Sequence, residues 1–474
     1  MPKALVYGVA ISGAATIRAL VQRGYNVVAA DDTVTEDKVT FANELGIDLV
    51  SAPDDATINQ LVVDCDLVAP APGVAETHPV VAAALQLGRP LRTEIDLAYE
   101  WEQQRSGGPR PMLAITGTDG KTTTTLLATA MLRAAGVSAM AVGNTEVPLI
   151  EAIGDPTLDA FVVECSSFRL SWITCFRAEA AVWLNLAPDH LNWHRDLASY
   201  EAAKARLWMY QRPTDVAIGC ASDAAVMRQL DRARGRKLSF GLSAGDYHCA
   251  RLPAVGGTLV GPMGPLCSVA EMRRALPHDI TNALAAAALV QQSGLADVAA
   301  IATALRSFVG PPHRIEPVGD GDGVHWYNDS KATTPHAALT AIRAFEHVVL
   351  IAGGRNKGLD LASLASEPAH MRGVVAIGES SDVIEAVFAG VCPVRRANTM
   401  REAVTTAGLM ARAGDAVVLS PGCASFDWYP DGGYPARGDD FRECVQDYLG
   451  LARADTPLVS AGTVPLAHIE GAAQ

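Results

Sequence analysis

The chain has 474 residues, of which 49% are hydrophobic and 19% are charged, and its formal net charge is −14. A chain of this length is too long for one hydrophobic core, so two to four domains are expected. The acidic balance argues against general binding to nucleic acid or to a membrane surface. Any anionic ligand must therefore be held by local positive groups.

Cysteine usage and the N-terminus favour a cytoplasmic protein. The nine cysteines form no CxxC pair and no zinc-like spacing, which predicts reduced and mostly buried thiols. The N-terminal segment MPKALVYGVAISG has a short apolar run that enters a glycine turn, which predicts a first strand and not a signal peptide. No stretch approaches ~18 uninterrupted apolar residues, so no membrane span is predicted.

The first module, residues 1–108, alternates short apolar runs with helical patterns, which predicts an α/β fold with a mostly parallel sheet. Its expected elements are a strand at 4–9, a helix at 13–24 and a strand at 26–31. The segment GVAISGAA is a degraded GxGxxG motif with Ala10 at the second glycine. Together with Asp31 at the end of the second strand it suggests an NAD site at first sight. The polar Gly/Pro segment 103–111 marks the boundary with the next module.

The second and third modules continue the α/β pattern. The second, residues 109–311, is predicted to contain strands at 112–116, in AFVVECSS and in AAVWLNLAPDH, a helix over 198–211, hairpin strands over 253–267 and an apolar helix in ITNALAAAALVQQ. The segment FVGPPHR, 308–314, marks its end. The third, residues 312–452, has strands in HVVLIAGG, GVVAIG and AVVLSPG. The tail, 453–474, lacks periodicity and is predicted to be poorly ordered.

The segment GTDGKT, which follows strand 112–116, resembles a phosphate-binding loop but is shorter than the common one. Only Thr118 and Asp119 separate Gly117 from Gly120, and a helix is predicted to begin near Lys121. Backbone N–H groups at a helix N-terminus form an anion site, and glycines let the chain approach a phosphate closely. Lys121 can reach the terminal phosphates, and the Thr122 hydroxyl is placed to bind Mg²⁺. An ordinary strand–turn–helix is the alternative.

Three further residues raise the odds of a nucleotide site. Glu164 ends the buried strand of FVVEC, at the edge where ligands of open parallel sheets collect. His190, in NLAPDHLNWH, follows another strand, and Lys204 lies among alanines in YEAAKARLW. Taken singly, they would more often be a helix cap, a structural histidine and a solvated lysine.

Taken together, GTxGKT, ExSSF, LNxxxDHL and YxxAKxR are similar to the Mur ligase superfamily, which also includes folylpolyglutamate synthetases. The shortened loop is that superfamily's own form of the phosphate loop. The resemblance extends over nearly the whole chain and implies a Rossmann-like nucleotide-sugar domain, a central ATPase domain with a mostly parallel sheet, and a mobile Rossmann-like C-terminal domain.

The third module is similar to the D-glutamate-adding branch of the superfamily. The segments that carry this resemblance are GPPHRIEPV, WYNDSKATTP, LIAGGRNKG and LSPGCASFDWYPDGGYPARG. The DNPR string of the diaminopimelate-adding branch is absent. The resemblance implies that ATP activates the L-alanine carboxylate of UDP-N-acetylmuramoyl-L-alanine as an acyl phosphate. The amine of D-glutamate then attacks it, in peptidoglycan precursor synthesis. A sister ligase adding another amino acid is the nearer alternative, and a non-catalytic nucleotide-sugar sensor is the more distant one.

The resemblance also implies roles for individual residues. The expected ATP-binding residues are Gly117, Thr118, Asp119, Gly120, Lys121, Thr122, Thr123, Asp279, Asn282, Arg314 and Asp329. Two Mg²⁺ sites are expected from Thr122, Glu164, His190 and Lys204, the lysine being carbamylated in the relatives. The expected catalytic residues are Lys121, Glu164, His190 and Lys204.

The substrate residues are likewise implied by the resemblance. For the UDP-sugar they are Gly8, Ser12, Gly13, Asp31, Asn144 and His190, with the first turn accepting the pyrophosphate and Asp31 facing uracil, so that UDP replaces the NAD interpretation. For D-glutamate they are Lys331, Thr333, Lys357, Ser425 and Tyr434. We expect the chain to act as a monomer.

The chain departs from the family pattern at three positions. Asp279 stands where an adenine-contacting Asn is expected, and an ionised Asp accepts but does not donate hydrogen bonds. Glu146 replaces a glycine near the sugar substrate, and Tyr434 stands where Phe is common. None of the three removes an expected phosphate or metal ligand, so we expect an active enzyme.

Overall fold

The structure, a computed structural model, describes residues 1–191, 193–251 and 256–451. It divides into two compact units, and the boundary falls between Phe308 and Val309, three residues before the sequence-based boundary at 311/312. The predicted tail, 453–474, lies outside the described residues. No helix in the described ranges is long and apolar enough to cross a membrane. All nine cysteines are free, as expected.

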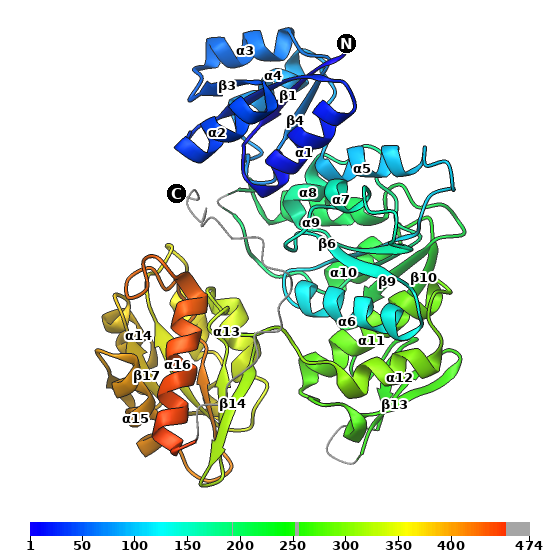
Figure 1. Ribbon diagram of the computed structural model, residues 1–474. Helices are drawn as coiled ribbons and strands as arrows, with labels where there is room; N and C mark the ends of the chain where they lie inside the picture. Colours follow the sequence, from blue (N-terminus) through cyan, green and yellow to red (C-terminus); the bar gives the residue numbers. More distant parts are fainter. Residues whose placement is uncertain (192, 252–255, 452–474) are drawn as a thin grey trace. The chain divides into compact units, whose positions relative to one another are not determined.

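The N-terminal part of the first unit is a four-stranded parallel sheet with the order β3-β2-β1-β4 (Figure 1). Its elements are β1 (Lys3–Tyr7), α1 (Ile11–Gln22), β2 (Asn26–Asp31), α2 (Glu36–Leu45), β3 (Asp48–Ser51), α3 (Asp55–Val63), β4 (Leu67–Pro70), α4 (Pro79–Gln86) and α5 (Glu94–Glu102). Alternate residues of β1 pack on opposite faces: Val6 lies in the core formed with α1, and Leu5 lies in the core formed with α3 and α4. Because both faces of the strand are covered, its residues form a continuous apolar run in the sequence.

The turn after β1 differs slightly from its prediction. The strand ends at Tyr7 because Gly8 adopts a φ of 90°, and the helix begins at Ile11 instead of residue 13. A Cβ on Gly13 would lie 1.8 Å from the Gly8 carbonyl oxygen. The helix therefore packs directly on the turn, as the third glycine of such motifs allows.

The central part of the first unit is a six-stranded parallel sheet with the order β10-β9-β8-β5-β7-β6. Its elements are β5 (Met112–Thr116), α6 (Lys121–Ala134), β6 (Ala139–Gly143), α7 (Leu149–Ala152), β7 (Ala160–Glu164), α8 (Ser167–Ser171), β8 (Ala180–Trp183), α9 (Leu197–Ala205), η1 (Arg206–Trp208), β9 (Val216–Cys220), α10 (Ala224–Leu230) and β10 (Arg236–Phe240). Strands β7 and β6 lie on one side of β5, and strands β8, β9 and β10 lie on the other. The carboxyl end of β5 is thus a topological switch point, where ligands of open α/β sheets bind.

The rest of the first unit is a small antiparallel sheet and two helices. These are β11 (His248–Ala250), β12 (Thr258–Gly261), β13 (Gly264–Ser268), η3 (Val269–Glu271), α11 (Pro277–Gln292) and α12 (Val298–Ser307). The predicted hairpin over 253–267 corresponds to β12 and β13, and 252–255 lie outside the described residues. Residues 283–290 of α11 are fully buried against α6, which fixes the helix that carries the phosphate loop.

The second unit is a six-stranded sheet with the order β14-β15-β19-β16-β17-β18, parallel except for the β14/β15 hairpin. Its elements are β14 (Glu316–Gly321), β15 (Val324–Asn328), α13 (Pro335–Ile342), β16 (Val348–Gly353), η4 (Leu361–Ala365), η5 (Pro368–His370), β17 (Met371–Ile377), α14 (Ser381–Phe388), β18 (Val394–Arg396), α15 (Met400–Met410), β19 (Ala416–Leu419) and α16 (Gly433–Leu449). The three strands predicted for this module are β16, β17 and β19.

Candidate functional site

The phosphate loop joins β5 to α6. Gly120 has a φ of 80° at the N-cap of α6, and a Cβ there would lie 2.6 Å from Asn282 Oδ1. The Asn185 side chain braces the loop by accepting hydrogen bonds from the N–H groups of Thr118 and Asp119, both at 2.9 Å. Lys121 Nζ donates to the Gly117 and Thr118 carbonyls at 2.9 and 2.6 Å. The loop is therefore a preformed turn that carries a cation at the start of a helix.

Glu164 ends β7, which pairs with β5. The residue is 1% exposed. Its Oε1 accepts a hydrogen bond from Asn144 Nδ2 at 3.1 Å, whereas its Oε2 has no hydrogen-bond partner among the described residues. A buried carboxylate oxygen without a partner costs free energy, and a bound cation would satisfy it.

The described residues do not form a complete metal cage by themselves. They contain no group of three or more His, Cys, Asp or Glu side chains that could hold a metal ion. Mg²⁺ is normally bound by one or two carboxylates together with water and substrate phosphates. The Glu164 Oε2 atom fits a metal of that kind, with a nucleotide completing the coordination.

Lys204 extends from α9 to the phosphate loop. The side chain is almost fully buried, at 1% exposure, and its Nζ donates to the Gly117 carbonyl at 2.7 Å. The Nζ also lies 4.6 Å from the centre of the Tyr200 ring. Burial, and next the neighbouring Lys121 charge, hold the pKa of Lys204 well below its ordinary value. The burial of Lys204 rules out the alternative of a solvated lysine.

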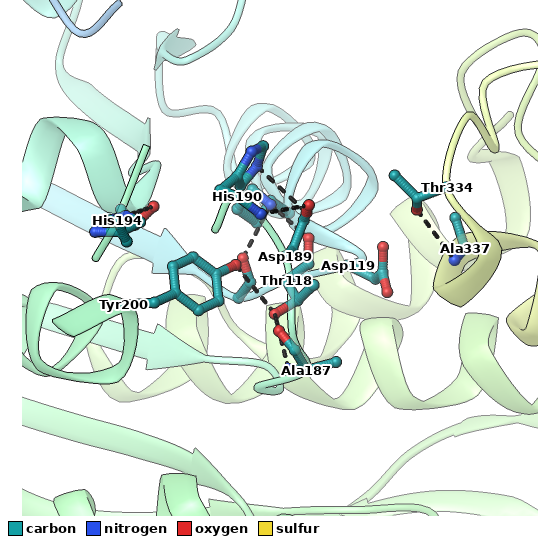
Figure 2. A network of polar contacts seen from close by, with 12 residues as sticks. Thr118, Asp119, Ala187, Asp189, His190, His194, Tyr200, Thr334 and Ala337 are labelled. Carbon is teal, nitrogen blue, oxygen red and sulfur yellow. Dashed lines mark hydrogen bonds and ion pairs between the residues drawn. The ribbon is translucent and has the colours of Figure 1, made fainter. Parts of the chain in front are cut away.

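His190 lies beside this loop on the segment between β8 and α9, as Figure 2 shows. Its φ of 54° is left-handed, and its Nε2 lies 3.3 Å from Asp189 Oδ2. The ring is exposed and makes an edge contact with Phe168 at 4.7 Å. On α9, Tyr200 points at Thr118, and the two hydroxyls are 3.2 Å apart.

The predicted adenine residues lie on α11. Asn282 contacts the phosphate loop at Gly120, as described above. The Asp279 carboxylate accepts hydrogen bonds from Arg274 Nε at 2.7 Å and from the Leu276 N–H at 3.2 Å. Asp279, which departs from the family pattern, thus forms an ion pair and caps the helix. A role in adenine binding stays a prediction.

The predicted UDP residues line the turn after β1. Asp31 accepts hydrogen bonds from the Val9 N–H at 2.6 Å, the Thr33 N–H at 2.9 Å and Lys38 Nζ at 2.8 Å. Its carboxylate therefore fixes the turn. Whether it also faces uracil stays a prediction.

A buried arginine that the sequence analysis missed joins this turn to the central sheet. Arg169 on α8 donates to Ser12 Oγ at 2.7 Å and to Glu94 Oε2 at 2.6 Å. Its neighbours Trp172 and Trp193 line a small hollow with it. The signal in the sequence was a cation between the apolar residues of SSFRLSW.

In the second unit, Arg314 stands between two residues in left-handed conformations, His313 with a φ of 60° and Ile315 with a φ of 45°. A β-branched residue in this region is strained by about 1–3 kcal/mol. The buried Asp329 stabilises the turn, because its Oδ1 accepts from the Ile315 N–H at 3.2 Å and its Oδ2 accepts from Ser420 Oγ at 2.7 Å. The predicted residues Arg314 and Asp329 thus lie at the same turn, which Asp329 stabilises through the N–H of the residue after Arg314.

Four of the predicted D-glutamate residues lie on three loops at the carboxyl ends of β15, β16 and β19, and the fifth, Tyr434, lies in the first turn of α16. Lys331 Nζ donates to the Tyr434 hydroxyl at 2.7 Å. The loop of the exposed Lys357 is joined to that of the buried Ser425, because Arg355 and Ala424 exchange backbone hydrogen bonds of 2.9 and 3.0 Å. Thr333 follows Lys331 on the first loop, where its N–H donates to the Lys331 carbonyl at 2.8 Å.

The chain forms two α/β units. One of them has a braced phosphate loop beside a buried carboxylate, which is typical of phosphate-binding enzymes. Comparison with known families agrees: residues 115–290 match the Mur ligase middle domain, and residues 313–423 match the Mur ligase glutamate ligase domain. The chain therefore belongs to the Mur ligase family, whose members depend on ATP.

Curated relatives cover nearly the whole chain. The UDP-N-acetylmuramoylalanine–D-glutamate ligase of Frankia casuarinae is 40% identical over 93% of this chain and 93% of its own. The proteins of the same name from Myxococcus xanthus and Streptomyces coelicolor are 38% and 36% identical, over 94% and 93% of this chain and 98% and 97% of theirs.

Solved structures support the fold. A pseudomurein peptide ligase type C from Methanothermus fervidus aligns with a TM-score of 0.59 at 15% identity, over 94% of this chain and 100% of its own. The UDP-N-acetylmuramate-alanine ligase MurC from Thermotoga maritima aligns with a TM-score of 0.56 at 18% identity, over the same shares.

Proposed function

We propose that this chain catalyses the ATP-dependent addition of D-glutamate to UDP-N-acetylmuramoyl-L-alanine, a step of peptidoglycan precursor synthesis. The observation that carries the proposal is the identity of up to 40%, over more than nine tenths of the chain, with ligases of that name. The proposed reaction takes place in the cytoplasm, and the working enzyme is a monomer.

The reaction requires activation of a carboxylate. An oxygen of the L-alanine carboxylate attacks the γ-phosphorus of ATP, and ADP leaves with the electron pair of the broken P–O bond. The amine of D-glutamate then attacks the carbonyl carbon of the acyl phosphate and loses a proton, and the tetrahedral intermediate expels phosphate. Catalysis of such a transfer rests on positioning and on neutralising charge.

The residues around the phosphate loop suit the first step. We assign the loop, Gly117 to Thr123, with Lys121 as the cation, to the ATP phosphates, and Asn282, Asp279, Arg314 and Asp329 to the rest of the nucleotide. Thr122 and Glu164 would hold Mg²⁺, which when bound neutralises phosphate charge. The partnerless Oε2 atom of Glu164 supports this assignment.

Lys204 and His190 are assigned to a second Mg²⁺. The depressed pKa of Lys204 supports its carbamylation, because the neutral amine is the form that attacks CO₂. The nitrogen forms a bond to the carbon of CO₂ and loses a proton, which leaves a carboxylate on the side chain. An oxygen ligand of this kind suits Mg²⁺, and an ammonium group would repel it.

The remaining assignments concern the two other substrates. The turn of Gly8, Ser12 and Gly13 would receive the UDP pyrophosphate, with Asp31 near uracil and with Asn144 and His190 near the sugar. Lys331, Thr333, Lys357, Ser425 and the backbone near Tyr434 would bind D-glutamate. All five side chains carry a charge or a hydroxyl, and Lys357 and Ser425 stand on the two joined loops, which supports a pocket for a dicarboxylate.

The acyl-phosphate route can be tested with oxygen isotopes. We expect ¹⁸O in the L-alanine carboxylate of the substrate to appear in the phosphate released during turnover with D-glutamate. Phosphate free of the label would contradict activation by ATP at that carboxylate.

A further inference from the structure

The loop of Lys331 is held by its backbone. The Lys331 N–H donates to the His313 carbonyl at 3.1 Å, and the Ala332 N–H donates to the Asp329 carbonyl at 2.9 Å. Ser330, which precedes the lysine, is fully buried. These contacts fix where the lysine side chain starts, but they leave its four-carbon stem to be oriented by other groups.

The first turns of α16 clamp the same loop. Ser330 Oγ donates to the Tyr434 carbonyl at 2.8 Å and accepts from Arg437 Nε at 2.9 Å. Arg437, which is 1% exposed, also donates to the Ser330 carbonyl at 2.8 Å and to the Cys423 carbonyl at 3.1 Å. The start of α16, the Lys331 loop and the loop of Ser425 therefore form one rigid assembly within the second unit.

Tyr434 also holds the end of the Lys331 side chain. The ammonium nitrogen donates to the Tyr434 hydroxyl at 2.7 Å and lies 4.0 Å from the centre of the same ring. The ring itself makes an edge contact with His313 at 6.0 Å. One tyrosine thus supplies a hydrogen bond and a cation–π contact to one flexible cation, and its own backbone is tied to the neighbouring residue of the loop.

We propose that the Tyr434 hydroxyl positions the Lys331 ammonium group to bind a carboxylate of D-glutamate. The proposal rests on the function proposed above, in which Lys331 belongs to the amino-acid pocket. A free lysine side chain samples many rotamers, and ordering it on binding costs affinity. A lysine already held by Tyr434 avoids part of that cost. Tyr434 acts through Lys331 and is therefore a positioning residue.

The isosteric change Tyr434→Phe tests this role, because it removes the hydroxyl and keeps the ring over the ammonium group. Steady-state kinetics of the full chain should show that KM for D-glutamate rises about fivefold to tenfold, as expected for loss of one hydrogen bond to a charged group. The values of kcat, KM for ATP and KM for UDP-N-acetylmuramoyl-L-alanine should stay within about twofold, because the hydrogen bond that the Tyr434 hydroxyl makes among the described residues is the one to Lys331.

A matched control lies just before this helix. The Tyr429 hydroxyl donates to Asp440 Oδ2 of α16 at 2.5 Å and, among the described contacts, has none with Lys331, so Tyr429→Phe should leave KM for D-glutamate unchanged. In a Lys331→Met background, Tyr434→Phe should cause no further rise in that KM. If Lys331→Met itself proves inactive, D-glutamate binding to the ATP-free protein gives the same comparison.

The outcomes separate this inference from the proposed function. Wild-type ADP formation that needs D-glutamate supports the function. With that in place, an unchanged KM for D-glutamate in Tyr434→Phe, or an equal rise in the KM of all three substrates, overturns the positioning role alone. Wild-type turnover without any need for D-glutamate contradicts the proposed function instead.

Discussion

At the scale of single residues, two buried groups distinguish this site from an ordinary strand–turn–helix. Glu164 Oε2 has no hydrogen-bond partner in the described part of the chain, and Lys204 reaches the phosphate loop at 1% exposure. Folding would ordinarily avoid a partnerless carboxylate oxygen and a buried amine. A buried lysine with a depressed pKa is typical of a functional site, and both groups support the ATP and metal assignments proposed above.

The first prediction concerns Lys204. Lys204→Ala should be nearly inactive and partly restored by formate or acetate, because a small carboxylate can replace the carbamate. The measurement is phosphate release with and without the added acid, with a thermal melt to show that the variant folds. Full activity of Lys204→Arg would contradict the carbamate, since arginine stays cationic.

The second prediction concerns Lys357, an exposed residue on a loop joined to that of Ser425. Lys357→Ala should raise KM for D-glutamate tenfold to hundredfold and leave KM for ATP nearly unchanged. The reason is that a hydrogen bond to a charged group contributes about 1.5–3 kcal/mol. Arg395→Ala, at another exposed cation of this unit, is the control. An unchanged KM would show that Lys357 is a solvated loop residue.

At the scale of elements, local patterns were enough to place the strands that carry the site. The predicted strands 26–31 and 112–116 coincide with β2 and β5, because buried parallel strands are short apolar runs that end at glycine or polar residues. The helix predicted over 198–211 is instead α9 up to Ala205, followed by the 3₁₀ turn η1.

Sequence patterns could not predict the residues that act through distant contacts. Arg169 and Glu94 are separated by 75 positions, and Arg437 and Ser330 by 107. Nothing near either arginine in the chain identifies its partner. Such pairs become visible only when the fold brings the two segments together.

The third prediction belongs to the packing of α8 against the segment before α9. His194 Nε2 lies 2.9 Å from Ser167 Oγ, and its side chain is 1% exposed. Burial, followed by the charges of His190 and Lys204, lowers its pKa from 6.5 to about 4. The unfolded chain therefore binds the proton first, so the free energy of unfolding should fall as the pH drops from 6.5 towards 4, by at most about 1.4 kcal/mol per unit of pKa difference.

Thermal midpoints at pH 7 and pH 5 check this prediction. His194→Gln should be less stable than the wild type at pH 7, and its deficit should shrink at pH 5, because glutamine does not titrate. His325→Gln, at an exposed histidine of β15, should show no such convergence. A deficit that is equal at both pH values would show that burial does not depress the pKa of His194.

At the scale of the whole molecule, the proposed sites for three substrates are distributed over two α/β units. The first unit carries the phosphate loop and the turn proposed for UDP, and the second carries the loops proposed for D-glutamate. Fold likeness to ligases below 20% identity supports only the architecture. The choice among amino acids rests on the relatives of 35–40% identity and on the glutamate ligase domain.

The most direct test is therefore ADP formation by the purified chain with ATP, Mg²⁺, UDP-N-acetylmuramoyl-L-alanine and one amino acid at a time. We predict turnover with D-glutamate and little or none with L-glutamate, L-alanine, L-lysine or diaminopimelate. Removal of the UDP substrate should abolish it. Comparable turnover with another of these amino acids, or none with D-glutamate by a folded protein, would contradict the central claim.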